Sequence, residues 1–306
     1  MASDRSIRIK NVPDPKSYSK EQENLPRIPY STYGILRMVL GRLFYADIDR
    51  DLTRLEESAD SMAKHIGELV RHALIKPNSL VVDLGCGYGA TSRALARFPD
   101  FKILGIDLDE VAIRKARELT GKTCQNINFH IADGNNLANL LRDDVLLDHW
   151  RSGIDNYDGK VDLVVCQTVF YRFDDLKQSL SQIHGSLKEG GILFFAELDR
   201  SYLHRWRTIS EAGKKISVLE VYGDLQNLRH HEFRKKYFET PFSDNFKFEV
   251  RRVAEFAASY TPFEVADILE ILGFELSEFT LIRDREKIPN AFVAFPRKKS
   301  TFSQLS

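Results

Sequence analysis

The chain has 306 residues, of which 43% are hydrophobic and 29% are charged, so it carries enough apolar side chains for an ordinary globular core. Its 44 Lys and Arg residues equal its 44 Asp and Glu residues, and this lack of a basic excess argues against a dedicated nucleic-acid binder. Cys86, Cys124 and Cys166 form no C-x-x-C pair and no metal-ligand spacing, so we expect reduced thiols and no metal site. Because neither a signal-peptide pattern nor an apolar run of about 18 residues occurs, we expect a cytoplasmic protein without a membrane partner.

Residues 1–79 form an N-terminal segment that precedes the first predicted strand. Its beginning is polar and rich in proline, which disfavours a helix there. Apolar residues at helical spacing then predict one helix over residues 31–44 and a second over about residues 50–75. Pro77 ends the second pattern, because proline cannot continue a helix.

A glycine loop, residues 85–89, follows the first predicted strand. Residues 80–84 have the apolar content of a buried parallel strand, and residues 91–98 predict a helix. Between them, glycines at alternate positions permit a sharp turn and the close approach of a ligand. The same loop also fits G-x-G-x-x-A, a dinucleotide-binding pattern. Asp83 argues against a dinucleotide, because a carboxylate beside a pyrophosphate would repel it.

The chain continues as alternating strands and helices, the pattern of a parallel α/β sheet. The later predicted strands cover residues 102–107, 126–132, 161–166, 274–283 and 290–295. The later predicted helices cover residues 109–120, 135–149, 174–187 and 263–272. Gly190 and Gly191 are predicted to end one helix and to turn the chain into strand five. Asp107 closes the second strand, where a carboxylate can accept hydrogen bonds from ribose hydroxyls or can cap the next helix.

Read from Asp83 as D-x-G-x-G-x-G, the glycine loop resembles the first motif of class I S-adenosylmethionine (SAM) dependent methyltransferases. Ala-Asp-Gly at residues 132–134 and the Gly-Gly turn before strand five resemble two further motifs of this family. The resemblance covers about residues 80–296, apart from one insertion. It implies a doubly wound, Rossmann-like α/β fold with a seven-stranded, mostly parallel sheet, N-terminal lid helices and SAM as cofactor. The SAM-binding domain would span residues 80–306.

The resemblance also implies roles for single residues. Asp83 would help to hold the methionine part of SAM, Asp107 the ribose and Asp133 the adenine amine. Tyr33 and Arg37, in the first lid helix, would reach the methionine carboxylate or the substrate; the alternative is that they only pack this helix onto the body. The predicted cofactor contacts are Asp83, Gly85, Cys86, Gly87, Asp107, Leu108, Asp133, Gly134, Gln167, Tyr33 and Arg37.

An insertion of about residues 198–260 follows strand five, and we expect it to form a helical cap that determines the substrate. Aromatic residues in the cap and after the fourth strand either line the acceptor pocket or belong to the core. These predicted pocket residues are Phe170, Tyr171, Tyr202, Trp206 and Tyr222. The charged run at residues 229–236 is either a solvated helix face or a cationic rim for an anionic substrate.

SAM carries an activated methyl group, so the protein has to align the acceptor and exclude water. A hydroxyl or amine acceptor also needs a base, whereas carbon methylation needs an aromatic pocket that stabilises a cation. The candidate bases are His204, His230, His231 and Glu197.

Nucleic-acid amino-methyltransferases carry an acid or Asn, two prolines and an aromatic residue after the fourth strand, whereas this chain has Cys-Gln-Thr-Val-Phe-Tyr at residues 166–171, which argues against base methylation. We therefore predict a SAM-dependent methyltransferase that acts on an O, N or C atom of a small molecule in specialised metabolism. The alternatives are a protein or nucleic-acid methyltransferase, and a SAM-binding regulator or cyclase that does not methylate. Whether the chain forms a homo-oligomer is left open.

Overall fold

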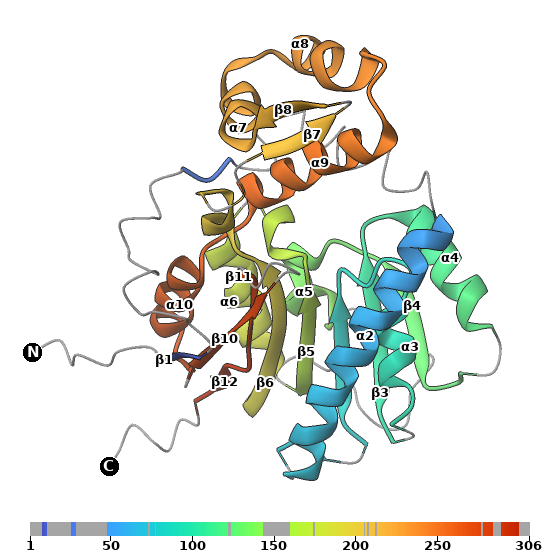
Figure 1. The fold of residues 1–306 in the computed structure, drawn as a ribbon. Coiled ribbons are helices and arrows are strands. Elements are labelled where there is room, and N and C mark those ends of the chain that lie inside the picture. Colours follow the sequence, from blue (N-terminus) through green and yellow to red (C-terminus); the bar gives the residue numbers. More distant parts are fainter. Residues whose placement is uncertain are drawn as a thin grey trace, which may run out of the picture.

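A central sheet runs through the protein in the strand order β1-β10-β11-β6-β5-β2-β3-β4 (Figure 1). The structure is a computed structural model that describes residues 8–10, 26–28 and 48–299, apart from residues 73, 77, 99, 122–123, 143–159, 174, 205, 207, 212, 277 and 284–288. The strands of the sheet are β1 (Arg8–Lys10), β2 (Leu80–Leu84), β3 (Lys102–Asp107), β4 (Ile127–Ile131), β5 (Val161–Gln167), β6 (Leu187–Leu198), β9 (Phe274–Glu275), β10 (Glu278–Arg283), β11 (Pro289–Ala294) and β12 (Arg297–Lys298).

The direction of the strands confirms the predicted doubly wound, mostly parallel sheet. Neighbouring strands from β4 through β3, β2 and β5 to β6 are parallel, whereas β11 lies antiparallel between β6 and β10. Asp83 in β2 stands opposite Gly105 in β3 and Val165 in β5. The carboxyl ends of these strands therefore meet at one edge of the sheet, where ligands of such folds bind.

Helices cover both faces of the sheet, which explains the continuous apolar run of β2. Val82 packs in the layer that holds α6 and α10, and Val81 packs in the layer of α2, α3 and α4; both side chains are fully buried. The helices of this part are α2 (Ile48–Arg71), α3 (Ala90–Leu95), α4 (Glu110–Thr120), the 3-10 turn η3 (Gly134–Asn136), α5 (Leu137–Leu140), the 3-10 turn η6 (Phe170–Arg172), α6 (Leu176–Ser186) and α10 (Pro262–Ile271).

The chain between β6 and α10 forms a separate lobe, the cap, above the edge where the carboxyl ends of the strands meet (Figure 1). Its elements are the 3-10 turn η7 (Arg200–His204), β7 (Thr208–Glu211), β8 (Lys214–Ser217), α7 (Val218–Asn227), α8 (His230–Arg234), the π-helical turn η8 (Lys235–Glu239) and α9 (Asp244–Ala258). The cap has an apolar core of its own, to which α7 and α9 contribute Leu225 and Val250. It is mainly helical, as expected, but it also contains the β7–β8 hairpin, which was not predicted.

The beginning of β6 corrects one prediction. Helix α6 ends at Ser186, so Gly190 and Gly191 lie inside the strand instead of capping the helix. Gly190 has a φ of 71°, and the register between β5 and β6 shifts after Val161. Tertiary pairing with β5 therefore makes an irregular strand of a segment that the local pattern assigns to a helix end.

The N-terminal half tests two further helix predictions. The second predicted lid helix is present as α2, whereas the first, over residues 31–44, lies outside the described residues. A helix was also predicted over residues 135–149. Its described part contains only the short η3 and α5, and residues 143–149 lie outside the described residues. Among the described residues, no helix is both long and apolar enough to cross a bilayer.

Candidate cofactor and methyl-transfer site

The glycine loop is tied to the neighbouring strand by its backbone. The N–H groups of Gly85 and Cys86 donate to Ile106 O of β3 at 2.7 and 3.0 Å. Gly85 has a φ of 73° and Gly87 a φ of 51°, the left-handed region that favours glycine. A Cβ atom on Gly85 would lie 2.5 Å from Val169, whereas one on Gly87 would meet none of the described residues within 4 Å. The loop is thus closed against the protein at Gly85 and open at Gly87.

Asp83 holds the beginning of α3 rather than facing the open side of the loop. Its carboxylate accepts from Ser92 Oγ at 2.6 Å, and the side chain is only 2% exposed. Gly89, at the N-cap of α3, has no side chain for this purpose, so Asp83 replaces the missing cap. Burial and, to a smaller extent, the nearby Asp107 raise the pKa of Asp83 to about 7, although the hydrogen bond from Ser92 opposes this shift. A contact of Asp83 with SAM stays a prediction, since its described hydrogen bond is internal.

Asp107 organises the loop from the end of β3. Its Oδ2 accepts from Gly87 N at 2.8 Å, and its Oδ1 accepts from Asp109 N at 2.9 Å. The cap of α4 is Asp109, whose side chain accepts from Val111 N and Ala112 N. The helix-capping alternative therefore falls on Asp109, and the partly exposed Asp107 carboxylate remains the predicted ribose ligand.

An exposed aliphatic surface lies beside Asp107. Leu108 is 65% exposed, Val111 54%, and Ile131, the strand partner of Asp107, 47%. Large exposed side chains at the ends of two adjacent strands suit the flat face of an adenine, and Leu108 is one of the predicted cofactor contacts.

The third predicted motif, Asp133-Gly134, lies directly after β4. Asp133 is exposed and accepts from Asn135 N and Nδ2, both at 2.9 Å. A Cβ atom on Gly134 would come within 2.5 Å of Leu84, so this position requires glycine for packing against β2. Contact of either residue with SAM stays a prediction.

The end of β5 forms a strained turn next to the glycine loop. Gln167 accepts from Thr91 Oγ1 at 2.9 Å and donates to Ser58 Oγ of α2, so it links β5 to α3 and to α2. Thr168 has a φ of 54°, which a β-branched residue rarely adopts. Such strain persists only where surrounding contacts impose it, and it often marks functional sites.

Glu197 of β6 supplies the contacts that impose this turn. Its Oε1 accepts from the N–H groups of Val169 and Phe170 at 2.8 and 3.1 Å, and its side chain is 3% exposed. Burial raises the pKa of Glu197 to about 8, although both N–H groups oppose this shift. The described contacts give Glu197 a structural role, and its predicted role as base stays a prediction.

The three candidate histidines belong to two elements of the cap. His204 lies in η7, directly after β6, and its side chain is outside the described residues. His230 and His231 begin α8, at the end of the cap farthest from the sheet (Figure 1). His231 is exposed. Of the three, only His204 follows closely in sequence on a strand of the central sheet.

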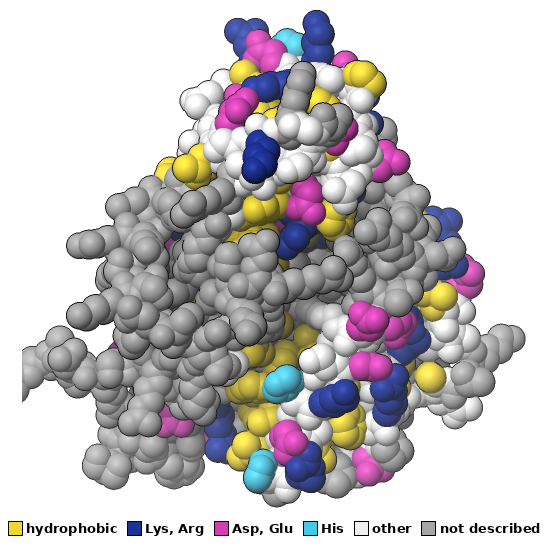
Figure 2. All heavy atoms as spheres, viewed as in Figure 1, with side chains coloured by type: hydrophobic (Ala, Val, Ile, Leu, Met, Phe, Trp, Pro, Cys, Tyr) yellow, Lys and Arg dark blue, Asp and Glu magenta, His cyan; other side chains and the backbone are white. Residues whose placement is uncertain are grey.

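The charged run of α8 and η8 pairs largely within the cap. Lys236 binds Glu220 and Asp224 of α7, and Arg234 binds Glu239. Figure 2 shows basic and acidic side chains intermixed over the tip of the cap. This arrangement favours the solvated helix face over a cationic rim.

The predicted pocket aromatics lie in two apolar cores instead of forming one wall. Phe170 packs in the core on the face of the sheet that α6 and α10 cover, with its ring centre 5.0 Å from that of Phe195. The other four belong to or pack against the cap core: Tyr171, Tyr202, Trp206 and Tyr222. Their contact with an acceptor stays a prediction.

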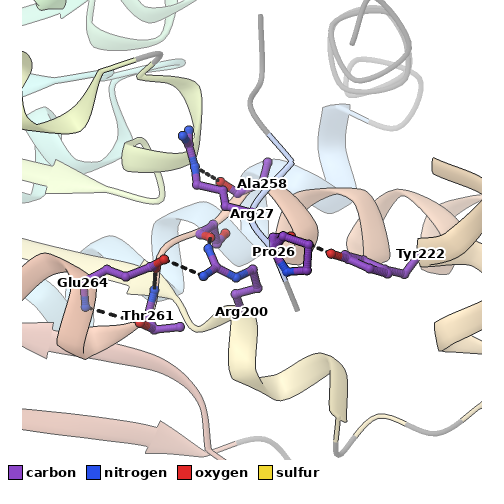
Figure 3. Close-up of polar contacts among 8 residues, drawn as sticks. Pro26, Arg27, Arg200, Tyr222, Ala258, Thr261 and Glu264 are labelled. Atoms are coloured by element: carbon purple, nitrogen blue, oxygen red, sulfur yellow. Dashed lines mark hydrogen bonds and ion pairs between the residues drawn. The ribbon is translucent and has the colours of Figure 1, made fainter. Parts of the chain in front are cut away.

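The junction between cap and sheet contains polar residues that the sequence patterns did not single out (Figure 3). Arg27 and Arg200, far apart in the chain, both bind the end of α9, and Arg200 also binds Glu264 of α10 at 2.6 Å. The only local signal was the capping box of α10, Thr-x-x-Glu at residues 261–264. Arg27 and Arg200 are single arginines outside any motif or periodic pattern, so no signal in the sequence marked them.

The sequence matches a family described as a methyltransferase domain over residues 75–242. Among curated proteins it is similar to a ubiquinone biosynthesis O-methyltransferase of Hydrogenovibrio crunogenus, with 27% identity over 152 residues, 48% of this chain and 56% of that protein. It is also similar to the methyltransferase phqN of Penicillium fellutanum (30% over 89 residues; 29% and 27%) and to a sterol 24-C-methyltransferase of Kluyveromyces lactis (38% over 61 residues; 20% and 16%). The matches thus span about half or less of these relatives' length.

Solved structures show the same fold at low sequence identity. The plantazolicin methyltransferase BpumL, in complex with a triazolic desmethylPZN analog and SAH, matches with a TM-score of 0.55 and 13% identity, over 92% of this chain and 100% of that chain. The corresponding BamL complex matches with a TM-score of 0.52 and 14% identity, over 87% and 94%. Together with the family match, these findings confirm the resemblance drawn from the glycine loop.

Proposed function

Because the chain belongs to the methyltransferase-domain family, whose cofactor is SAM, we propose that it transfers the methyl group of SAM to an O, N or C atom of a small-molecule acceptor. The observation that carries the small-molecule part is the cap, which stands over the carboxyl ends of the parallel strands. Its helix α9 contacts η6, the turn that follows β5. A lobe in this position encloses an acceptor, whereas a protein or nucleic-acid acceptor needs an open surface.

The residues at the edge of the sheet fit SAM. Among the described residues no atom lies within 4 Å of a Cβ on Gly87, which leaves room for a ligand there. The carboxylate of Asp107 is partly exposed, and Leu108 offers an apolar face. In this proposal Asp107 holds the ribose and Leu108 contacts the adenine. The names of two relatives, a ubiquinone biosynthesis enzyme and a sterol methyltransferase, support a place in small-molecule biosynthesis.

When bound, SAM supplies a methyl group that its sulfonium charge already activates. The chain's own task is then to fix the acceptor and exclude water, which the turn after β5 and the cap would do. For a hydroxyl or amine acceptor a base has to take the proton, and His204 is the best placed candidate because η7 begins two residues after β6 ends. Glu197 is less suited, because its Oε1 already binds two backbone N–H groups.

Calorimetric titration of the full chain with SAM, SAH and NAD tests the cofactor. We expect binding of SAM and SAH in the micromolar range and none of NAD; binding of NAD alone would contradict the proposal. A screen of small molecules that carry a hydroxyl group, an amine or a nucleophilic carbon atom, monitored by SAH release, then tests the acceptor. Release of SAH only with a protein or nucleic acid would favour the open-surface alternative, and binding without any turnover would favour a regulator.

A further inference from the structure

The last carbonyl groups of α9 are bound by donors from two distant parts of the chain (Figure 3). The carbonyls of residues 257–259 accept, in chain order, from Ile28 N at 2.9 Å, from Arg27 Nε at 2.9 Å and from Arg200 Nη1 at 2.7 Å. The end of a helix leaves its last carbonyls without partners inside the helix and carries partial negative charge. Two guanidinium groups therefore stabilise the point where the cap returns to the sheet.

Arg27 also reaches the turn after β5. Its Nη2 donates to Phe173 O at 2.9 Å, and Phe173 closes η6. The guanidinium lies 4.0 Å from the centre of the Tyr260 ring, and the Tyr260 hydroxyl donates to the same Phe173 carbonyl at 3.5 Å. One side chain thus joins the end of the cap helix, the linker behind it and the turn beside Gln167.

The residues around Arg27 are themselves fixed on the cap. Pro26 O accepts from the hydroxyl of Tyr222 in α7, and Ile28 is 2% exposed within the cap core. We call residues 26–28 the strap. Since the strap contacts both α7 and α9, it holds Arg27 in place from the cap side.

Arg200 performs a different task at the same helix end. It is 3% exposed, and its Nη2 binds Glu264 of α10, so it ties the cap to the body of the protein. Attachment of the cap therefore does not depend on Arg27 alone. What only Arg27 adds, among the described contacts of these two arginines, is the hydrogen bond to the turn after β5.

We propose that Arg27 is a positioning residue for methyl transfer, which sets the distance between the cap and the turn after β5. This inference rests on the proposed function, because it places the acceptor between these two elements. Arg27 touches neither the glycine loop nor Asp107 in the described contacts. Its loss should therefore leave cofactor binding intact and slow the transfer itself.

Amide hydrogen exchange of the full chain tests the linkage with the variants Arg27→Ala and Arg27→Lys. In Arg27→Ala we expect exchange to rise by roughly 10- to 100-fold both in residues 255–259 and in residues 170–173, the scale for loss of hydrogen bonds to a charged group. Arg27→Lys should restore part of the protection of one segment only, because an ammonium group lacks the planar fork that spans two carbonyls. Arg114→Ala, at an exposed position of α4, is the matched control and should change neither segment.

Titration with SAH separates this proposal from the proposed function. We expect the Kd for SAH to stay within about threefold in Arg27→Ala, because the cofactor edge is unchanged. With the acceptor from the screen, kcat should fall about tenfold or more while the KM for SAM is unchanged. Unchanged exchange in residues 170–173, or unchanged kcat, would overturn the proposal. If Arg27→Ala does not fold, Tyr222→Phe serves as the second variant under the same criteria, because it removes the hydrogen bond to Pro26 O. Failure of the unmodified protein to bind SAH would count against the proposed function only.

Discussion

The sheet and the cap build their polar sites by different means. In the sheet, Asp83, Asp107 and Gln167 stand at or near the carboxyl ends of adjacent parallel strands, and each binds a neighbouring loop or helix. In the cap junction, Arg27 and Arg200 come from unrelated positions and meet at the end of α9. The first arrangement follows from the topology of the sheet, and the second depends on the packing of the cap.

This difference suggests that the sheet edge serves the cofactor and that the cap serves the acceptor. A topology that brings strand ends together forms the same edge whatever covers it, which suits a shared cofactor. A lobe with its own apolar core, such as the one around Tyr237 and Val250, can change without altering that edge. The following predictions test whether the two regions are as independent as their contacts indicate.

The largest effect is expected for Gly85→Ala. The new Cβ would collide with Val169 at 2.5 Å and would require a φ of 73°, so we expect a loss of about 2–5 kcal/mol in the free energy of unfolding. Gly87→Ala is the matched control, since Gly87 also has a left-handed φ, of 51°, and a Cβ there would meet no atom of the described residues within 4 Å. It should lose only about 1–2 kcal/mol of stability. Chemical denaturation measures both, and equal losses would refute the role assigned to Val169.

Arg200→Ala should cost about 2–4 kcal/mol, because it leaves the buried Ser259 carbonyl without its donor and opens space beside α9. We expect the loss in thermal or chemical unfolding, with the Kd for SAH nearly unchanged. Arg97→Ala is the control, since its ion pair with Asp60 is exposed and should contribute less than about 1 kcal/mol. A large loss of SAH affinity in Arg200→Ala would show that cap and cofactor edge are coupled.

Glu197→Gln should change the pH dependence of stability. Burial raises the pKa of Glu197 from 4.5 to about 8 in the folded protein, so the folded state binds its proton more tightly than the unfolded state. This contribution to stability is complete below about pH 4.5 and is lost as the pH rises to about 8. Between pH 5 and 8 the unmodified protein should lose about 3–4 kcal/mol more of its free energy of unfolding than Glu197→Gln does, measured by denaturation. Parallel curves would contradict this account; Gln keeps the Oε1 acceptor, so the turn should persist.

Asp107→Ala should weaken SAM binding by about 1–3 kcal/mol, the scale for removing a charged hydrogen-bond partner. Asp109→Ala, two residues away, removes a helix cap instead and should lower stability by about 1 kcal/mol without changing the Kd for SAM. Calorimetry with both variants distinguishes the two acids. Unchanged SAM affinity in Asp107→Ala would remove the ribose assignment.

The edge of the sheet could be predicted from the sequence because its signals are local. An apolar run, an acid and glycines with left-handed φ follow one another within ten residues around Gly85. The hairpin β7–β8 was missed although Ile209 and Ile216 alternate with polar residues on either side of Gly213, the pattern of a hairpin. The signal was present, but the helical cap was expected from the place of the insertion after strand five and not from its local pattern.

Other features could not be predicted, because distant contacts determine them. The position of Gly190 within β6 depends on pairing with β5 and on Arg297, whose Nε donates to Gly190 O at 2.9 Å. The role of Arg27 depends on a helix end more than 200 positions away in the chain. Residue type and spacing contain neither fact.

The two chain crossings between sheet and cap lie side by side. Arg200 N donates to Tyr260 O at 3.5 Å, so the segment between them leaves and re-enters the body at nearly one point. Insertions whose ends meet in this way are readily gained, lost or exchanged during evolution, because the host fold needs only a short replacement loop. The cap is therefore a natural unit for recombination, and grafting a foreign lobe between residues 200 and 260 is a direct route to enzymes with new acceptors on this scaffold.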